Sequence, residues 1–370
     1  MGYNIRIYKE PHNLQYAKQY ICDAIDSSWI CINGKYIDNC VDIFKEKLGV
    51  KHVILTDSGT SALHCCMVAL KKKYPHITKL YVPNNVYVSL WNTAKLVFPS
   101  EMIEALDCDP DTWNIDTSLI DTLEKNSALF VVHNIGNIVN IPALKRKRPD
   151  IVFLEDNCEG FPGSYEGNAA GSESFVSTIS FNMNKTVTSG HGGAFCTNDD
   201  ETYEYIYDFV RVGSTRHQKY LYQFAGYTYG YTNLQAALLY SQLIQLDKIM
   251  ERKQYVFEYY TTHLNHPKIK FQKWEENTQH SYWYFALRIL GNASYDIFKE
   301  HMDKNGIETR PMFYHITCQP HLNDIRCITD KNAQLVNNEC ALLPCYSSIT
   351  DDELSIVVRV VLDYCNKIEK

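Results

Sequence analysis

The spacing of apolar residues predicts helices alternating with strands through the first half of the chain. Apolar residues recur at helical spacing in 14–26 and in 36–49, and the second run ends at Gly49. Short apolar runs that are typical of buried strands follow, with helical patterns between them. We expect these strands at 51–57, 79–84, 102–107, 128–134 and 151–156, and helices at 58–74, 88–97, 117–124 and 142–147. This alternation predicts a mostly parallel sheet with helices on both faces.

The pattern changes after residue 156. The strand-like runs 174–181 and 192–198 precede a stretch that we expect to be helical to about residue 250, with one long amphipathic helix over 233–264. The remaining expected elements are a strand at 282–290, a helix near 294–305, a segment at 307–314 and a closing helix from 351. Together these patterns predict an α/β protein with a large domain over 1–245 and a small α+β domain over 246–370.

Composition narrows the class of protein. Hydrophobic residues make up 45% of the 370 residues and charged residues 21%, which is ordinary for a soluble globular protein. A formal charge of −7 argues against nucleic acid or an acidic membrane surface as the main partner. No apolar run approaches the roughly 18 residues that cross a membrane. The 13 cysteines are odd in number and form no C-x-x-C pair, so we expect reduced thiols and a cytoplasmic protein. The histidines lack metal-ligand spacing, and we expect no metal.

A Gly-Thr-Ser turn, Gly59-Thr60-Ser61, joins one of the predicted strands to a predicted helix. The first N–H groups of a helix have no partner within the helix and carry a partial positive charge, so they can hold a phosphate. The simpler interpretation is that Ser58 or Thr60 caps the helix, and the turn alone favours that interpretation.

Two further residues, taken together with this turn, indicate a cofactor site. A buried strand ends at Asp156, where a carboxylate can hold a cation such as a protonated ring nitrogen or can merely cap the next loop. Lys185 stands in a polar turn with glycines behind it, a setting in which most lysines are solvated. A phosphate cradle, a strand-end aspartate and a downstream lysine are together the parts of a pyridoxal 5'-phosphate (PLP) site.

Ordered motifs along nearly the whole chain resemble the DegT/DnrJ/EryC1/StrS family of sugar-nucleotide aminotransferases. The matching stretches include GVKHVILTDSGTSALH, YVPNNVYVSLWNTA, EDNCEG, SFNMNKTVTSGHGGAF, GYTYGYTNLQAAL and GIETRPMFYHITCQP. The resemblance implies an aspartate aminotransferase-like fold (PLP fold type I). It also implies PLP as cofactor, with pyridoxamine phosphate in the cycle, and a homodimer whose sites lie at the interface.

The resemblance also implies roles for individual residues. It makes Lys185 the lysine that forms the Schiff base and Asp156 the partner of the pyridine nitrogen. The other implied cofactor contacts are Gly59, Thr60, Ser61 and Ser180 at the phosphate, Tyr87 at the ring face, Glu159 near the ring oxygen, and Thr228 at the partner's phosphate. Packing in the core is the alternative for Tyr87.

Some positions depart from the family pattern. Thr228 and Gly230 stand where the family more often has Asn and Arg. Thr317 stands at the usual histidine, while His315 replaces a frequent proline. Arg310 and His315 are the implied substrate contacts, and a surface ion pair is the alternative for Arg310.

The implied reaction transfers the amino group of L-glutamate, which leaves as 2-oxoglutarate, to a keto-sugar nucleotide. The segment GIETRPMF most resembles the 4-aminotransferases that make viosamine or perosamine, so we expect UDP- or dTDP-linked 4-keto-6-deoxyglucose as substrate and a viosamine nucleotide as product. The alternatives are GDP-perosamine synthesis, a 3-aminotransferase, or a non-catalytic PLP-binding protein. In relatives that dehydrate a sugar a histidine replaces the lysine, so Lys185 argues against dehydration.

Overall fold

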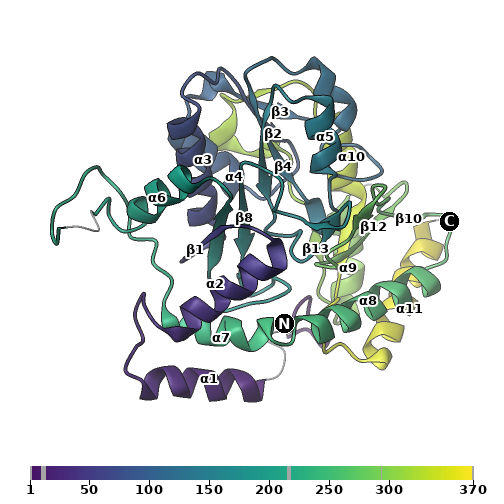
Figure 1. Ribbon diagram of the computed structural model, residues 1–370. Helices are drawn as coiled ribbons and strands as arrows, with labels where there is room; N and C mark the ends of the chain where they lie inside the picture. Colours follow the sequence, from purple (N-terminus) through teal and green to yellow (C-terminus); the bar gives the residue numbers. More distant parts are fainter. Residues whose placement is uncertain (1, 10–13, 215–217, 293, 369–370) are drawn as a thin grey trace.

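An eight-stranded sheet forms the centre of the N-terminal part of the computed structural model, which describes residues 2–9, 14–214, 218–292 and 294–368 (Figure 1). Its strand order is β1-β9-β8-β5-β4-β2-β3-β14. The strands are β1 (His52–Thr56), β2 (Leu80–Pro83), β3 (Ile103–Leu106), β4 (Ala128–Val132), β5 (Val152–Asp156), β8 (Val176–Ser180), β9 (Gly193–Thr197) and β14 (Arg326–Cys327). Strand β9 runs antiparallel to β1 and β8, and all other pairs are parallel. The prediction of a mostly parallel sheet is therefore confirmed.

Helices cover both faces of this sheet. Apolar residues of α3 (Gly59–Lys73), α4 (Ser89–Val97) and α6 (Asp200–Phe209) pack with those of the strands in one buried cluster. On the other face α2 (Lys35–Leu48) and α7 (Asn233–Leu243) form a second cluster, and α5 (Ile141–Lys147) contributes to a third. Helix α1 (Leu14–Asp26) packs along α7. This three-layer arrangement leaves the ends of the strands as the place for a site.

A smaller antiparallel sheet organises the C-terminal part. Its order is β10-β12-β15-β13, with β10 (Ile269–Phe271), β12 (Phe285–Ile289), β13 (Arg310–Pro311) and β15 (Cys340–Leu343). Its helices are α8 (Leu246–His263), α9 (Tyr295–Lys304), α10 (Lys331–Glu339) and α11 (Asp351–Ile368), which share one apolar cluster with the strands. A three-stranded ribbon of β6 (Ser164–Tyr165), β7 (Asn168–Ala169) and β11 (Thr278–Gln279) links the two parts.

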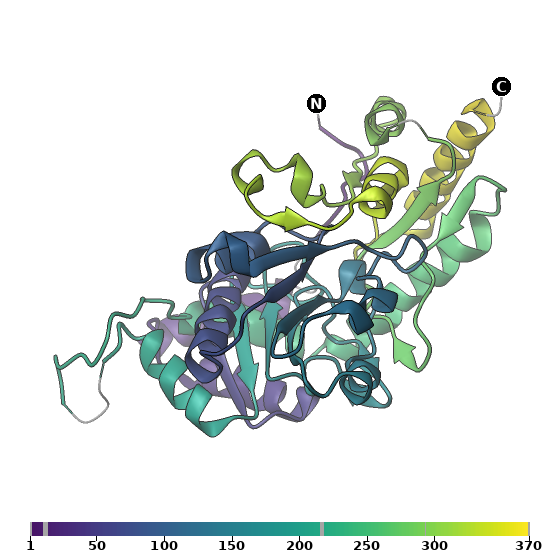
Figure 2. The ribbon, with the colours of Figure 1, turned by 90° about the horizontal axis from the view of Figure 1, so that it is seen from above.

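Two segments cross the predicted domain boundary at 245/246. Strand β14 adds to the large sheet beside β3, and Ile5 pairs with Ile307 of the C-terminal part. Figure 2 shows the yellow-green segment around residue 320 lying against the N-terminal part. The division into two domains stays a prediction.

Three local predictions differ from the structure. The expected helix 233–264 is divided at Ile244 and Gln245 into α7 and α8. The segment expected near 117–124 is a 3-10 helix, Thr117–Thr122. The stretch between α6 and α7 is not helical in its described residues; it projects from the body, and the pairs Arg211–Thr228 and Ser214–Tyr222 bridge its two sides (Figures 1 and 2). Aromatic side chains of this stretch stack on one another or on α6 instead of forming the apolar face of a helix. Tyr227 stacks on Tyr229, and Phe224 stacks on Tyr205 of α6.

Candidate active site

The residues predicted to bind PLP surround a cavity of about 240 Å³ at the ends of β5 and β8. Most of them line its wall, together with residues that were not predicted. The predicted residues on the wall are Gly59, Thr60, Tyr87, Asp156, Glu159, Ser180 and Lys185. The turn after β1, the ends of β5 and β8 and the loop after β8 therefore converge on one site, although they are far apart in the sequence.

Lys185 lies in the loop between β8 and β9, and its side chain is 13% exposed. Its Nζ atom is 3.7 Å from Oε1 of Glu159 and 4.0 Å from the centroid of the Trp283 ring. A carboxylate and an aromatic face both stabilise an ammonium group held against them. The lysine is thus fixed on the cavity wall rather than solvated, and the solvated-lysine alternative is wrong.

Glu159 is buried beside this lysine. Its Oε2 atom accepts a hydrogen bond of 2.9 Å from the backbone N–H of Ile135. Burial raises the pKa of the Glu159 carboxyl to about 7, while the positive charge of Lys185 opposes the rise. Near neutral pH this carboxyl can therefore exchange a proton with a neighbouring group.

Asp156, the last residue of β5, turns its carboxylate into the cavity and is 8% exposed. Its Oδ1 atom accepts hydrogen bonds from Thr178 Oγ1 at 3.2 Å and from the Cys158 backbone N–H at 3.0 Å. These two donors come from the neighbouring strand and from the following loop. They fix the orientation of the carboxylate, so Asp156 does more than cap a loop.

The Gly59-Thr60-Ser61 turn begins α3. Ser58 is its N-cap and accepts a hydrogen bond of 3.0 Å from the Ser61 backbone N–H, so the capping interpretation holds for Ser58. The Ser61 hydroxyl donates to Asp57 at 2.5 Å and belongs to this cap rather than to the cavity wall. A Cβ at Gly59 would stand 2.9 Å from Cβ of Ser180, so only glycine lets the helix start reach the end of β8.

Aromatic rings form the open side of the cavity. Tyr87 is 58% exposed, and its ring meets the ring of Phe313 edge-on, with centroids 5.9 Å apart. Tyr87 is therefore not a core residue, and its alternative interpretation is wrong. Phe313 comes from the C-terminal part and lines the cavity beside Tyr87.

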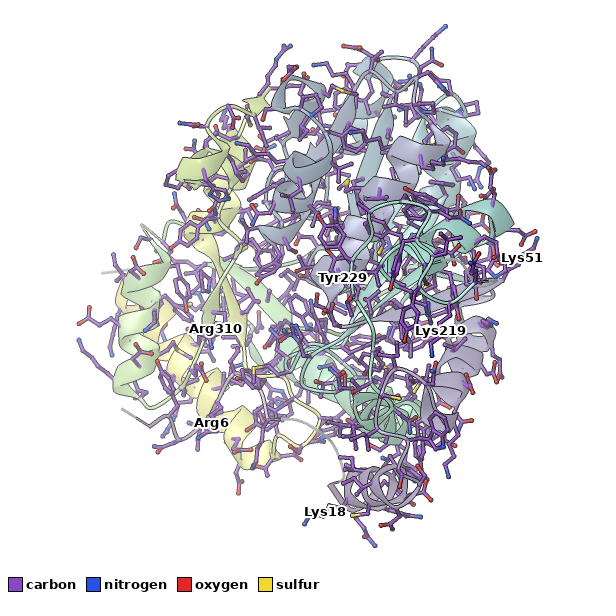
Figure 3. All side chains as sticks on the ribbon, turned by 90° about the vertical axis from the view of Figure 1, so that its left-hand side faces the viewer. Arg6, Lys18, Lys51, Lys219, Tyr229 and Arg310 are labelled. Carbon is purple, nitrogen blue, oxygen red and sulfur yellow. The ribbon has the colours of Figure 1, made fainter. Side chains whose placement is uncertain are left out.

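Three predicted residues lie away from this cavity. Thr228 is exposed and sits on the projecting segment, where it pairs with Arg211. Arg310 forms an ion pair of 2.7 Å with Glu308, as its surface alternative expected, and Figure 3 labels it on the surface of the C-terminal part. His315 is buried and contacts Cys318 and Thr317. Within one copy of the chain, none of the three lines the cavity.

The sequence did not predict that Trp283 lines the cavity beside Lys185. Its indole Nε1–H donates to the backbone oxygen of Asn184 at 2.9 Å, next to Lys185. Its own backbone oxygen accepts from the buried Lys253 Nζ at 3.0 Å. A tryptophan in an apolar run gave no sign of this role, because the contact joins residues about a hundred positions apart.

Comparisons with known proteins identify the family. The model of the DegT/DnrJ/EryC1/StrS aminotransferase family matches residues 13–362. The chain belongs to this family. Its relatives include the GDP-perosamine synthase of Escherichia coli O157:H7, 29% identical over 82% of this chain and 83% of that protein. The enzyme of the same name from Vibrio cholerae is 28% identical over 94% of this chain and 96% of its own length.

Solved structures confirm the fold. E. coli GDP-4-keto-6-deoxy-D-mannose-3-dehydratase with bound hydrated PLP superposes with a TM-score of 0.89, covering 97% of this chain and 100% of that chain at 19% identity. The predicted fold type I is thereby confirmed, as are the aminotransferase class and the PLP cofactor. No helix among the described residues is long and apolar enough to cross a membrane. In the same residues no cluster of His, Cys, Asp and Glu could hold a metal ion.

The cavity fits PLP on its own chemistry. It combines an amine for the aldehyde, an oriented carboxylate for the ring nitrogen and a glycine-lined helix start for the phosphate. Lys185, Asp156 and the Gly59–Thr60 turn are the residues that would hold it.

Proposed function

We propose that this protein transfers the amino group of L-glutamate to C4 of a nucleotide-linked 4-keto-6-deoxy sugar. The observation that carries the proposal is the placement of Lys185 in a cavity that also contains Asp156 and Glu159. An amine beside a carboxyl that titrates near neutral pH suits a reaction that moves protons in both directions.

When bound, PLP supplies an electron sink for the pair released as the Cα–H bond of the amino acid breaks. Lys185 Nζ is the base positioned to take that α-proton and to return a proton later in the cycle. Glu159, 3.7 Å away, can hold the proton that Lys185 carries between these steps.

Asp156 supports this chemistry without taking part in proton transfer at the amino acid. Its fixed carboxylate would keep a proton on the ring nitrogen, and that positive charge raises the acceptor strength of the ring. The Gly59–Thr60 turn would hold the phosphate at the start of α3. Asp156 and the Gly59–Thr60 turn would thus set the position of the ring relative to Lys185.

The choice of sugar rests on the GIETRPMF segment and on the relatives. The segment favours UDP- or dTDP-linked 4-keto-6-deoxyglucose and a viosamine nucleotide as product. The relatives named GDP-perosamine synthase make the GDP-linked manno sugar the second candidate. In both candidates the amino group enters at C4.

We also propose that the active form is a homodimer. Trp29 and Ile30, 58% and 49% exposed, lie in the loop before α2, and Tyr220 and Tyr222 of the projecting segment are exposed as well. Burial of such residues is a common source of association energy. A second copy could bring Thr228 to the phosphate end of the cavity, where Thr60 is exposed. Light scattering of the active fraction tests this: a strictly monomeric active species would contradict it.

The substrate is tested by incubating the holoenzyme with ¹⁵N-labelled glutamate and each 4-keto-6-deoxy sugar nucleotide, linked to UDP, dTDP or GDP. We expect ¹⁵N at C4 of one product by NMR, and no transfer by Lys185→Ala. Incorporation at C3, or none with any of the three nucleotides, would overturn the proposed substrate class.

A further inference from the structure

Lys253 of α8 is a buried lysine that the proposed function does not use. It is 4% exposed, and in the part of the chain that the structure describes no carboxylate lies within ion-pair distance of its Nζ atom. Nζ donates instead to two backbone oxygens, that of Trp283 at 3.0 Å and that of Cys345 at 3.1 Å. Burying a charge without a counter-ion destabilises a protein, whereas an apolar side chain of the same length would pack without that cost. The ammonium therefore calls for an explanation beyond packing.

The two oxygens that Lys253 binds lie where the pairing of β12 with β15 has ended. Trp283 precedes β12 by two residues, and Cys345 follows β15 by two residues. Neither carbonyl has a partner in the ladder, and a buried acceptor without a donor costs free energy. The Cys345 thiol donates to the Trp283 oxygen at 3.3 Å but is a weak donor. Lys253 is thus the strong donor that fixes the backbone where Trp283 leaves the sheet.

The backbone that carries Trp283 is sharply bent. Tyr282, the residue before it, has a φ of 55°, a left-handed conformation that a residue with a side chain keeps only where its surroundings hold it. One such contact is the Tyr282 backbone N–H, which donates to Nδ1 of His280 at 2.8 Å. Burial and, after it, the positive charge of Lys253 lower the pKa of His280 to about 3, so the ring stays neutral and can accept this bond. Lys253 therefore supports the bend on both sides of Tyr282.

The bend directs the Trp283 ring at the loop that carries Lys185. The indole Nε1–H donates to the Asn184 oxygen at 2.9 Å, and Lys185 Nζ is 4.0 Å from the ring centroid. Lys253, Trp283 and Lys185 also line one small cavity of about 10 Å³, which is too small for a substrate. Lys253 does not line the cofactor cavity. Its route to the chemistry therefore runs through Trp283.

We propose that Lys253 is a positioning residue, which holds the Trp283 ring against Lys185 by binding the Trp283 backbone oxygen. The inference rests on the proposed function insofar as Lys185 carries out the reaction. With Lys253 in place, the ring gives Lys185 an aromatic face and anchors the residue before it, Asn184. Without the ammonium the bent backbone loses its strong donor, and the ring can move away from the amine.

Hydrogen exchange of the Trp283 indole tests the inference without any substrate. The full-length protein is labelled with ¹⁵N at its five tryptophans, and Trp283→Phe identifies the Nε1–H signal of Trp283. In Lys253→Met, which has no donor, we expect this signal to exchange roughly tenfold faster. Trp91, whose indole also donates to a backbone oxygen at 3.0 Å, should change by about twofold or less. Lys253→Arg can still bind both oxygens and should return the Trp283 rate to within about threefold of the unmodified protein.

Lys268→Met is the matched control, because Lys268 Nζ also donates to a backbone oxygen of the C-terminal part, that of Ile368 at 3.3 Å. It should leave the Trp283 signal unchanged. Lys253→Gln, which keeps one amide group as donor, replaces Lys253→Met if that variant does not fold, and thermal melts establish the folding of each. Unchanged exchange of the Trp283 indole in the folded variant would overturn the proposal, and Lys253 would then only join α8 to the small sheet.

A double-mutant cycle in kcat connects the ring to the reaction. Lys253→Met and Trp283→Phe should each lower kcat about fivefold and leave the KM for glutamate unchanged. The double variant should lose about twofold or less beyond either single variant, because both changes act through the same ring. Independent losses that multiply to about 25-fold would overturn the proposal. A holoenzyme without activity on any sugar nucleotide would contradict the proposed function alone, since indole exchange does not depend on turnover.

Discussion

Glu155 and Asp156 are neighbouring carboxylates on one strand, yet the structure gives them opposite tasks. Side chains alternate along a strand, so the two project to opposite faces of the sheet. Asp156 points into the cofactor cavity. Glu155 is fully buried and accepts hydrogen bonds from His133 Nε2 at 2.6 Å, Tyr165 OH at 3.2 Å and the Gly171 backbone N–H. The same chemical group therefore serves the site on one face and the packing on the other.

The hydrogen-bond networks around Glu155 and Asp156 differ in how many of the carboxylate oxygens receive a donor from the protein. His133 Nδ1 accepts from the Val139 backbone N–H at 3.1 Å, so Nε2 carries the hydrogen that it donates to Glu155. Every donor around Glu155 thus comes from the protein. The donors at Asp156 all reach Oδ1, and its carboxylate still borders open space. A complete network stabilises the fold, whereas an incomplete one at a cavity is available to a ligand.

The largest effect should follow from removing the charge of Asp156. Asp156→Asn keeps the shape but cannot stabilise a protonated ring nitrogen, so we expect kcat/KM to fall roughly 10³-fold. The matched control is Glu155→Gln, which should change kcat/KM by about threefold or less and which tests the neighbour on the other face. Steady-state kinetics with glutamate measure both, and equal losses in the two variants would contradict the division of tasks.

Removing Glu155 altogether should affect folding instead of catalysis. Glu155→Ala leaves His133, Tyr165 and Gly171 without their acceptor, and we expect a loss of about 3–5 kcal/mol in the free energy of unfolding. Glu155→Gln retains an acceptor oxygen and should recover most of this loss. Urea titrations provide the values. If Glu155→Ala were as stable as the unmodified protein, the network would not stabilise the fold.

Glu159 should make stability depend on pH. Its pKa is raised from 4.5 to about 7, so the folded state binds a proton that the unfolded state has lost between these values. Its contribution to stability is therefore complete below pH 4.5 and declines as pH rises towards 7, by on the order of 3 kcal/mol. We expect cofactor-free Glu159→Gln to lose less stability than the unmodified protein between pH 4.5 and 8. Identical pH slopes of the unfolding free energy would refute the assignment.

Trp283 should give the smallest effect. Trp283→Phe removes the hydrogen bond to Asn184 and weakens the aromatic face under Lys185, a loss of about 1 kcal/mol, so we expect kcat to fall about fivefold. The KM for glutamate should stay unchanged, because the ring contacts the lysine. Trp274→Phe is the control, since Trp274 is 42% exposed and stacks on His280. An unchanged kcat in Trp283→Phe would show that the ring only fills space.

Local patterns predicted most elements, because apolar spacing reflects which face of an element is buried. Helix α1 begins and ends where its pattern does, and β5 lies within the predicted run 151–156. The expected helix over 233–264 is interrupted because its two halves serve different parts of the molecule. Residues of α7 pack beneath the large sheet, as do Leu246 and Ile249 at the start of α8, whereas the later residues of α8 pack on the small sheet. A continuous apolar stripe does not reveal that its two halves have different partners.

The short sequence motifs predicted residues that the fold brings together, although their roles in binding the cofactor stay predictions. Asp156, Lys185 and the Gly59 turn lie on the wall of one cavity. Trp283 and Phe313 could not be found in the same way, because their contribution depends on how the C-terminal part folds back onto the N-terminal part. The placement of His315 could not be predicted from the sequence for the same reason, because its partner Asp330 lies in another loop.

Reduction with borohydride tests most directly whether Lys185 holds the cofactor covalently. The holoenzyme is reduced, digested and mapped by mass spectrometry for the lysine that carries the pyridoxyl group. We expect the group on Lys185 alone, and we expect glutamate added before reduction to abolish that labelling. A pyridoxyl group on another lysine, such as the buried Lys253 beside Trp283, would contradict this account of the site.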